Sequence, residues 1–234
     1  MRLSDLKGIF RRGRLGFISA ENVFDDYWVV RLKPEEGMRW TPGEHGIFTM
    51  PGKKFKGRKW RVFSVASSPD EGVVMIGTRT GEIASNFKRT LFRLEPGEKV
   101  NLIGPFGWFT LNNGGRQIVM SASGVGITPV RAIAMELDKH PDKTVEILHS
   151  GKYHLFMEDL KKKADETDVL HLHFAEDREE MKHELTRLAV KYANNASYYV
   201  SGSINAITSM KRILRKSGVK GNRIINDPFI GYRR

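Results

Sequence analysis

The 234-residue sequence contains no cysteine. This absence excludes disulfides, thiol catalysis and cysteine-ligated zinc. It also excludes an iron–sulfur cluster held by this chain, because such clusters need thiolate ligands. We therefore expect any one-electron carrier that works with this protein to be a separate molecule.

Long apolar runs are also missing. No segment approaches the roughly 18–20 apolar residues that a membrane-spanning helix needs. The first residues, Met1 to Lys7, are not followed by the apolar core of a signal peptide. A cytoplasmic location is the resulting prediction. The 40% hydrophobic and 28% charged residues are ordinary for a globular protein, and the length suffices for two modest domains or one large one.

Basic residues exceed acidic ones, 39 against 27, which gives a net charge of +12. A local basic run lies between residues 53 and 61, where Lys and Arg side chains alternate with Phe55 and Trp60. The run is interpreted first as a solvated loop ahead of a strand. Attraction of an acidic redox partner or of nucleotide phosphates is the second interpretation. Nucleic-acid binding is set aside, because no nucleic-acid-binding module accompanies the run.

The first half of the chain has the pattern of short strands. Segments rich in β-branched and aromatic residues, separated by Pro-Gly and Ser-Pro-Asp turns, occupy 26–32, 46–50, 60–67 and 72–78. Apolar residues at helical spacing predict one helix over 83–94. Short and frequent strands indicate a closed or nearly closed antiparallel β-barrel over residues 1–112.

After the run Asn112-Asn113-Gly114-Gly115 the pattern changes to strand–helix alternation. Strands are predicted at 117–122, 144–149, 169–175, 197–201 and 223–226, and helices at 128–139, 156–164, 179–192 and 205–216. Regular alternation predicts right-handed crossovers and an α/β doubly wound parallel sheet with helices on both faces. The predicted fold is therefore two-domain, with a boundary between 112 and 113.

The segment Arg61-Val62-Phe63-Ser64 combines a cation, an aromatic ring and a hydroxyl on one predicted strand. Arg61 and Phe63 are two residues apart and therefore project from the same face. This set suits a ligand that has a phosphate and a flat ring. Taken alone, the segment also fits an ordinary barrel strand with one exposed arginine.

Two glycine-containing segments are typical of phosphate binding at a helix start. One is Gly81-Glu82-Ile83-Ala84-Ser85, where unpaired backbone N–H groups favour an anion, or where a simple glycine turn ends in a serine cap. The other is Gly124-Val125-Gly126-Ile127-Thr128-Pro129, which follows an apolar strand but lacks the third glycine of the dinucleotide fingerprint. Together, the motifs indicate two phosphate-bearing ligands, one for each half of the chain.

The order and spacing of these motifs resemble the ferredoxin–NADP reductase superfamily over nearly the whole chain. The resemblance implies an FAD-binding β-barrel domain, 1–112, and an NAD(P)-binding α/β domain, 113–234. It implies a reductase that passes a hydride from NAD(P)H to FAD and then electrons to an external acceptor. That acceptor would be a small molecule or an acidic redox protein such as a ferredoxin or flavodoxin.

The resemblance also assigns residues. Arg61 and Ser85 would hold the flavin diphosphate, Phe63 would stack on the flavin and Ser64 would reach the ring near N5. Ser201 stands where the family commonly has a cysteine, Asp227 where glutamate is frequent, and Phe229 would shield the flavin. The catalytic set is thus Ser64, Ser201 and Phe229. The cofactor-binding set comprises Arg61, Val62, Phe63, Ser64, Thr78, Arg79, Gly81, Ile83, Ala84, Ser85, Gly124, Gly126, Thr128, Pro129, Ser150, Lys152, Gly202 and Phe229.

Two other functional classes remain open. The chain would serve as a non-catalytic flavin electron-transfer subunit of a larger complex, or as a nucleotide-binding module that has lost redox activity, to which Ser201 points. No metal site is expected. His171 and His173 alternate on one predicted strand, but two imidazoles without a third ligand are interpreted as structural.

Overall fold

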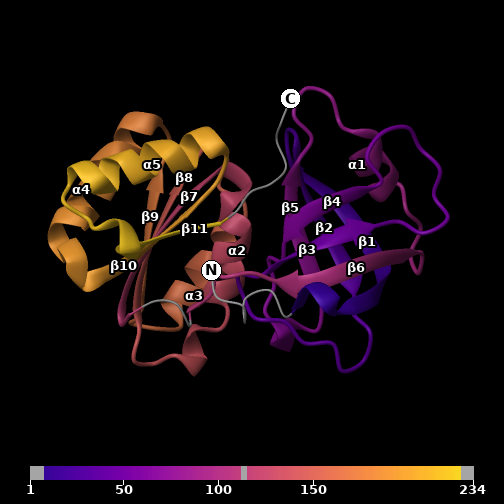
Figure 1. Ribbon diagram of the computed structural model, residues 1–234, viewed down its shortest axis with the longest axis horizontal. Coiled ribbons are helices and arrows are strands. Elements are labelled where there is room, and N and C mark those ends of the chain that lie inside the picture. The colour runs from indigo at the N-terminus through magenta and orange to yellow at the C-terminus, as the bar shows by residue number, and fades with distance from the viewer. Residues whose placement is uncertain (1–7, 112–114, 228–234) are drawn as a thin grey trace. The chain divides into compact units, whose positions relative to one another are not determined.

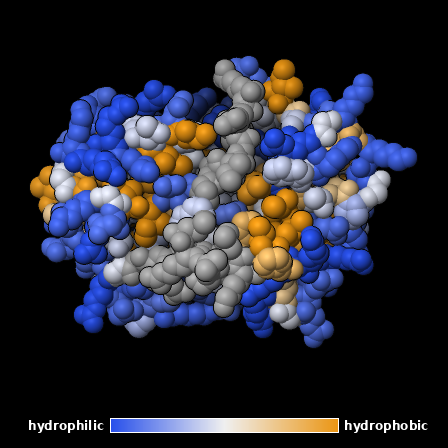
Figure 2. Space-filling model, viewed as in Figure 1, coloured by the Kyte–Doolittle hydropathy of each residue, from blue (hydrophilic) through white to orange (hydrophobic). Residues whose placement is uncertain are grey.

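The structure is a computed structural model that describes residues 8–111 and 115–227. The chain divides into two compact units, Met1–Thr110 and Leu111–Arg234. The predicted boundary falls two residues from this division. On the face shown in Figure 2, hydrophilic side chains predominate on both units and apolar side chains gather in smaller patches.

The first unit is built on a six-stranded antiparallel sheet (Figure 1). Its strands are β1 (Arg12–Phe24), β2 (Tyr27–Lys33), β3 (His45–Thr49), β4 (Trp60–Ser64), β5 (Val74–Arg79) and β6 (Lys99–Phe106), in the order β4-β3-β6-β1-β2-β5. The outer strands approach each other just beyond β4, where the Ala66 amide donates to the Met75 carbonyl at 2.7 Å. The nearly closed barrel predicted from the sequence is confirmed as a half-barrel.

Apolar residues of the strands fill the inside of this half-barrel. Leu15, Val30, Phe48 and Leu102 are fully buried in one cluster. The short helix α1 (Asn86–Leu91) adds Phe87 and Leu91 to the same cluster, so it closes the space that the sheet leaves open. Burial of large aromatic and aliphatic side chains is the main stabilising contribution to such a unit.

The prediction was wrong about two strands and one helix in this unit. It missed β1, whose hydrophobic alternation is short because polar residues and two register shifts interrupt it. It also missed β6. The helix predicted over 83–94 is only six residues long, because Ser85 has extended backbone and caps it at Asn86.

The second unit contains a five-stranded parallel sheet in the order β11-β10-β7-β8-β9. Its strands are β7 (Gln117–Ser123), β8 (Thr144–Ser150), β9 (Leu170–Ala175), β10 (Ala196–Ser201) and β11 (Ile224–Asn226). The helices are α2 (Ile127–Ala134), α3 (Met157–Asp165), α4 (Arg178–Tyr192) and α5 (Ile204–Lys216). All nine predicted elements are confirmed, with α2 ending earlier than predicted and followed by a separate turn at Leu137–Lys139.

The helices of this unit cover both faces of the sheet. Helix α2 contacts α3, and α4 contacts α5, with the two pairs on opposite faces (Figure 1). From β7 the chain first builds outward through β8 and β9, and then crosses to add β10 and β11 on the other side. The order therefore reverses between β7 and β10. In open α/β sheets, ligands bind at the carboxyl ends of the strands where the order reverses.

No helix within the described part of the chain is both long and apolar enough to span a membrane.

Candidate functional site

Strand β4 places Arg61 and Phe63 against the same helix. The Arg61 guanidinium carbon lies 5.6 Å from the Phe87 ring centre, and its Nη1 donates to the Trp60 carbonyl at 2.9 Å. Phe63 packs at 5.6 Å from Phe48 and 6.3 Å from Phe87, between ring centres. The two side chains therefore share one face of the strand, as their spacing predicts.

Phe63 and Ser64 are buried, at 6% and 5% exposed, whereas Val62 is half-buried. The Phe63 ring belongs to the barrel core. Its predicted stacking role, like the role of Ser64 near flavin N5, stays a prediction.

The segment after β5 forms a turn held by Asp26. The Arg79 Nε donates to both carboxylate oxygens of Asp26, at 3.0 and 3.1 Å, and the Gly81 amide donates to Oδ2 at 2.8 Å. Gly81 has φ +68°, a left-handed conformation that favours glycine. The expectation of bare N–H groups in this segment is wrong at Gly81, because the Asp26 carboxylate already accepts from it.

The other predicted residues of this turn differ widely in exposure. Thr78 is buried at 3% exposed, Ala84 is half-buried, and Ile83 is 82% exposed and outside the core. The Ser85 hydroxyl accepts from the Lys88 amide at 3.4 Å, so it caps helix α1. The serine is thus at a helix start, as predicted, but its hydroxyl serves the helix in this structure.

Lys88 is a charged residue of this site that the sequence analysis missed. Its side chain is buried and its Nζ donates to the Arg79 carbonyl. Burial, together with the Arg61 and Arg79 charges and against the attraction of Asp26, lowers the pKa of Lys88 to about 8. The sequence carried one signal: long side chains on a helix lean towards its N-terminus, so a lysine one turn after Ser85 points back to the glycine turn.

In the second unit, the loops after β7 and β10 come into close backbone contact. A Cβ atom on Gly126 would lie 2.6 Å from the Gly202 amide nitrogen and 2.6 Å from the Ser201 carbonyl carbon and oxygen. Gly124 and Gly202 have φ of +55° and +145°. The structure thus brings together Gly124, Gly126, Ser201 and Gly202, at the point where the strand order reverses.

The loop after β8 joins this group. The His149 ring Nε2 lies 3.0 Å from the Gly124 carbonyl, and a Cβ on Gly151 would lie 3.7 Å from the Gly124 amide nitrogen. Ser150 ends β8 and is 8% exposed. Lys152 extends over the Tyr153 ring, with Nζ 4.9 Å from its centre. The carboxyl ends of three adjacent strands, β10, β7 and β8, therefore converge.

Thr128 and Pro129 lie in the first turn of α2 and are buried. The Thr128 hydroxyl donates to the Val125 carbonyl at 2.7 Å, so it fixes the glycine loop from within. A direct contact of this hydroxyl with a nucleotide stays a prediction. Proline fits the first turn of a helix because its missing N–H has no partner to lose there.

Ser201 and Asp227 form a buried pair at the end of β10. The Ser201 hydroxyl donates to Asp227 Oδ2 at 3.3 Å, and the two residues are 0% and 2% exposed. The Asp227 amide donates to the Val200 carbonyl at 3.1 Å, which fixes the carboxylate beside the strand. Phe229, the third residue of the predicted catalytic set, lies outside the described residues.

Burial lowers the pKa of three histidines, His45, His149 and His154. Burial lowers the pKa of His45 to about 4, and burial together with the nearby His154 lowers the pKa of His149 to about 3. Nδ1 of each of the three rings is buried without a hydrogen-bond partner. His173 Nε2 instead donates to Glu146 Oε2 at 2.7 Å. Across the described residues, no group of three or more candidate ligands is placed to hold a metal ion.

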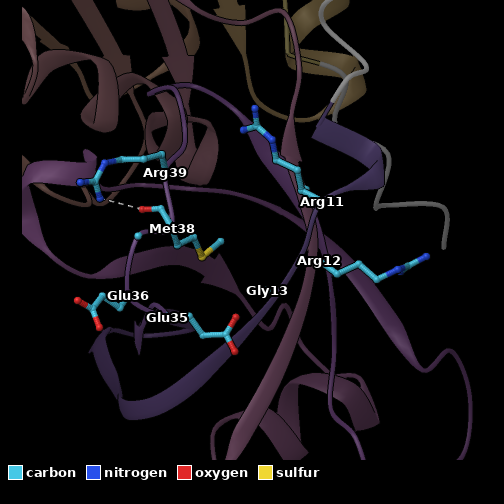
Figure 3. Close-up of a pocket in the computed structure, with 9 residues that line it drawn as sticks. Arg11, Arg12, Gly13, Glu35, Glu36, Met38 and Arg39 are labelled. Carbon is cyan, nitrogen blue, oxygen red and sulfur yellow. Dashed lines mark hydrogen bonds between the residues drawn. The ribbon is translucent and has the colours of Figure 1, made fainter.

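The first unit also has a hollow of about 370 Å³ that none of the predicted site residues line. Its lining includes Arg11, Arg12 and Arg39 together with Glu35 and Glu36. Figure 3 shows that the three guanidinium groups point in different directions. The arginines therefore do not converge on a common anion, and the phosphate-binding assignment rests on the β4–β5–α1 residues instead.

No protein-family model matches the sequence. The flavohemoprotein of Bacillus subtilis is 23% identical over 181 residues, which cover 68% of this chain and 43% of that protein. The chain thus spans less than half the length of the curated relatives it matches.

Solved structures match over nearly the whole chain. A ferredoxin NADP⁺ reductase from Neisseria gonorrhoeae with bound FAD and NADP has a TM-score of 0.72 at 14% identity, covering 92% of this chain and 98% of that one. The flavohem-like FAD/NAD-binding domain of nitric oxide dioxygenase from Vibrio cholerae has a TM-score of 0.70 at 19% identity, covering 93% and 98%. The fold is therefore the two-domain fold of ferredoxin–NADP reductase-like flavoproteins, and the fold that the resemblance implied is confirmed.

Proposed function

We propose that this chain is an NAD(P)H-dependent flavoprotein reductase, with FAD held by the first unit and NAD(P)H by the second. The observation that carries the proposal is the match, over 92% of this chain and 98% of the other, to a reductase with bound FAD and NADP. Whether the residues of the first unit suit FAD, and those of the second unit suit NAD(P)H, is a test that does not depend on this match.

The first unit offers charges that fit a flavin diphosphate. Arg61, Arg79 and Lys88 contribute three positive charges and Asp26 one negative charge to one neighbourhood. Positive side chains of this kind suit the negative charge of a diphosphate. Charge-assisted hydrogen bonds to phosphate are among the stronger polar interactions in proteins.

The second unit offers a backbone cradle rather than charge. Gly124 and Gly202 have left-handed φ angles at the ends of β7 and β10, and no side chain of theirs obstructs a ligand. The carboxyl ends of strands at a reversal point are where open α/β sheets bind nucleotides. Ser150 and Lys152 extend the cradle along β8, which suits the adenosine end of the ligand.

When bound, FAD accepts a hydride from NAD(P)H at N5 and releases electrons one or two at a time. The protein's own task is to bind and orient. Arg61, Arg79 and Lys88 would fix the diphosphate, and Ser64 would place a hydroxyl beside the flavin ring. The buried Ser201–Asp227 pair would hold a hydroxyl at the end of β10, where the family commonly has a thiol.

The electron acceptor belongs to the proposal as well. We assign a small molecule or an acidic redox protein such as a ferredoxin or flavodoxin, which the net charge of +12 supports. Because the chain spans less than half of the curated relatives it matches, a role as the flavin module of a larger electron-transfer assembly is the alternative. The cytoplasmic location stays a prediction.

Cofactor release and anaerobic reduction test the proposal. Flavin released by heat from the purified protein should co-elute with FAD, and NADH or NADPH should bleach the bound flavin under nitrogen. Bleaching separates an active reductase from a passive relay. FMN as the sole released flavin, or a protein that binds no flavin when reconstituted, would show the assignment to be wrong.

Arg61→Ala tests the diphosphate assignment. Loss of one charge-assisted phosphate contact should weaken FAD binding about 10- to 150-fold, because such a contact contributes roughly 1.5–3 kcal/mol. Arg58→Ala is the matched control, since Arg58 lies just before β4, is exposed and stacks on Trp60 at 4.6 Å. Equal FAD affinity in the two variants would reduce Arg61 to a residue of the barrel surface.

A further inference from the structure

His149 is a fully buried histidine at the carboxyl end of β8. It lies opposite Ala122 of β7, just before the glycine loop that begins at Gly124. Its ring Nε2 is 3.0 Å from the Gly124 carbonyl oxygen. Burial and the nearby His154 lower its pKa to about 3, so near neutral pH the ring has a single N–H. Because a carbonyl oxygen only accepts, this proton is on Nε2 and the ring donates to the loop.

The other ring nitrogen makes a histidine unfavourable at this position. Nδ1 of His149 is buried and has no hydrogen-bond partner. A buried polar atom without a partner costs free energy that an apolar side chain of similar size would avoid. The ring packs edge-on with His154, 5.0 Å away between centres, and His154 packs on Phe174 at 4.9 Å. Packing of this kind is open to apolar residues too, so the hydrogen bond to the glycine loop is what distinguishes the histidine.

This hydrogen bond acts on one peptide group of the loop. The Gly124 carbonyl also accepts from the Ile127 amide, at the start of α2. The peptide bond between Gly124 and Val125 is trans, and in a trans peptide the N–H points opposite to the C=O. The Val125 N–H is therefore directed away from His149. By holding the carbonyl, the ring fixes the direction of an N–H group at the carboxyl end of β7, where nucleotides bind in open α/β sheets.

We propose that His149 is a positioning residue for the nucleotide: its Nε2–H holds the Gly124 carbonyl so that the Val125 N–H is directed to the diphosphate of NAD(P)H. The inference rests on the proposed function, because it gives a task to a residue of the unit that would bind NAD(P)H. His149 is fully buried, so it acts through the loop and not by touching the ligand. NADH and NADPH have the same diphosphate, so the effect is equal for both nucleotides.

The test measures the dissociation constants of NAD⁺ and NADP⁺ by calorimetry on the purified full chain, without turnover. His149→Leu and His149→Met both remove the ring N–H. Each should bind both nucleotides about 3- to 10-fold more weakly, the factor that one neutral hydrogen bond contributes. His149→Gln keeps an N–H near the position of Nε2, so its affinity should lie within about twofold of the wild type. His171→Leu is the matched control, since His171 is exposed on β9 of the same sheet, and should behave as the wild type.

Thermal unfolding separates this role from a purely structural one. The Gly124 carbonyl keeps the Ile127 amide as a donor when the imidazole is removed, so the unfolding midpoints of His149→Leu and His149→Met should stay within about 4 °C of the wild type. Unchanged nucleotide affinity in these variants would overturn the inference. So would a loss of affinity that His149→Gln shares in full, or one that accompanies a larger fall in the midpoint. A wild-type protein that binds neither NAD⁺ nor NADP⁺ would instead refute the proposed function, and the inference with it.

Discussion

Position 126 requires glycine because there is no room for a side chain, and not because of its backbone conformation. Its φ of −60° and ψ of −14° lie in the right-handed region that every residue adopts. A methyl group at this position would meet three backbone atoms of Ser201 and Gly202, each at 2.6 Å. Because these are main-chain atoms of the loop after β10, no flexible side chain can turn away to make room.

The size of the effect follows from two opposing terms. At an open site, Gly→Ala stabilises a protein by about 0.4–1 kcal/mol, because alanine restricts the unfolded chain. Overpacking a close-packed interior costs about 1–3 kcal/mol, and contact with rigid backbone places Gly126→Ala at the upper end of that range. We therefore expect Gly126→Ala to lower the free energy of unfolding by about 2 kcal/mol.

Urea titration monitored by circular dichroism measures this loss, and a nucleotide titration of the folded variant should show weaker NADPH binding. Gly115→Ala is the matched control in the same unit, because the nearest heavy atom to its new methyl group would be the Ser197 Oγ at 4.0 Å. We expect the control to lie within about 0.5 kcal/mol of the wild type. A Gly126→Ala protein as stable as Gly115→Ala would refute the argument from backbone contact.

Three further predictions concern charge. Lys88→Met should stabilise the flavin-free protein at pH 7 by about 2 kcal/mol, because a Lys88 pKa lowered from 10.5 to about 8, chiefly by burial, corresponds to a penalty of about 3 kcal/mol, which the loss of its polar contacts offsets in part. In urea titrations the gain should shrink between pH 8 and 10; a destabilised variant at pH 7 would contradict this. Burial alone would raise the Glu146 pKa, but hydrogen bonds from His173, Tyr192 and Lys191 lower it to about 2. Stability should therefore fall as pH drops from 4.5 towards 2, by up to about 3 kcal/mol, and a Glu146→Gln protein with the same acid sensitivity would exclude this cause. Lys152, with no acidic residue before Glu158, favours NADPH, and steady-state kinetics showing a higher kcat/KM for NADH would reverse this assignment.

Lys88 and Glu146 are both buried charged residues, but their surroundings differ. Glu146 is 3% exposed, yet three donors from β9 and α4 satisfy its carboxylate, so its charge is favourable in the folded protein. Lys88 donates to a backbone carbonyl, and burial together with the Arg61 and Arg79 charges lowers its pKa although the Asp26 charge raises it. A buried residue with a shifted pKa is a common mark of a functional site.

The amino-acid sequence by itself determined the architecture of the second unit. Its strands and helices carry local periodicities of two and 3.6 residues, and each short connection restricts the next element to a right-handed crossover. The glycine loop after β7 and the serine at the start of α1 were identified in the same way. These features depend on neighbours in the chain, so a single sequence suffices to find them.

Only the tertiary structure decided the contacts between distant segments. Strand β1 became the centre of the first sheet although its own alternation is weak, because pairing with β2 and β6 compensates for its polar residues. The Asp26 carboxylate accepts from the amide of Gly81, 55 residues away, so this N–H group is not available to an anion as the glycine segment alone predicted. Gly126 allows the loop after β7 to contact the backbone of the loop after β10. The charges of Arg61 and Arg79 lower the pKa of Lys88. Spacing along the chain carries no information on such encounters, because they depend on how the sheet brings its strands together.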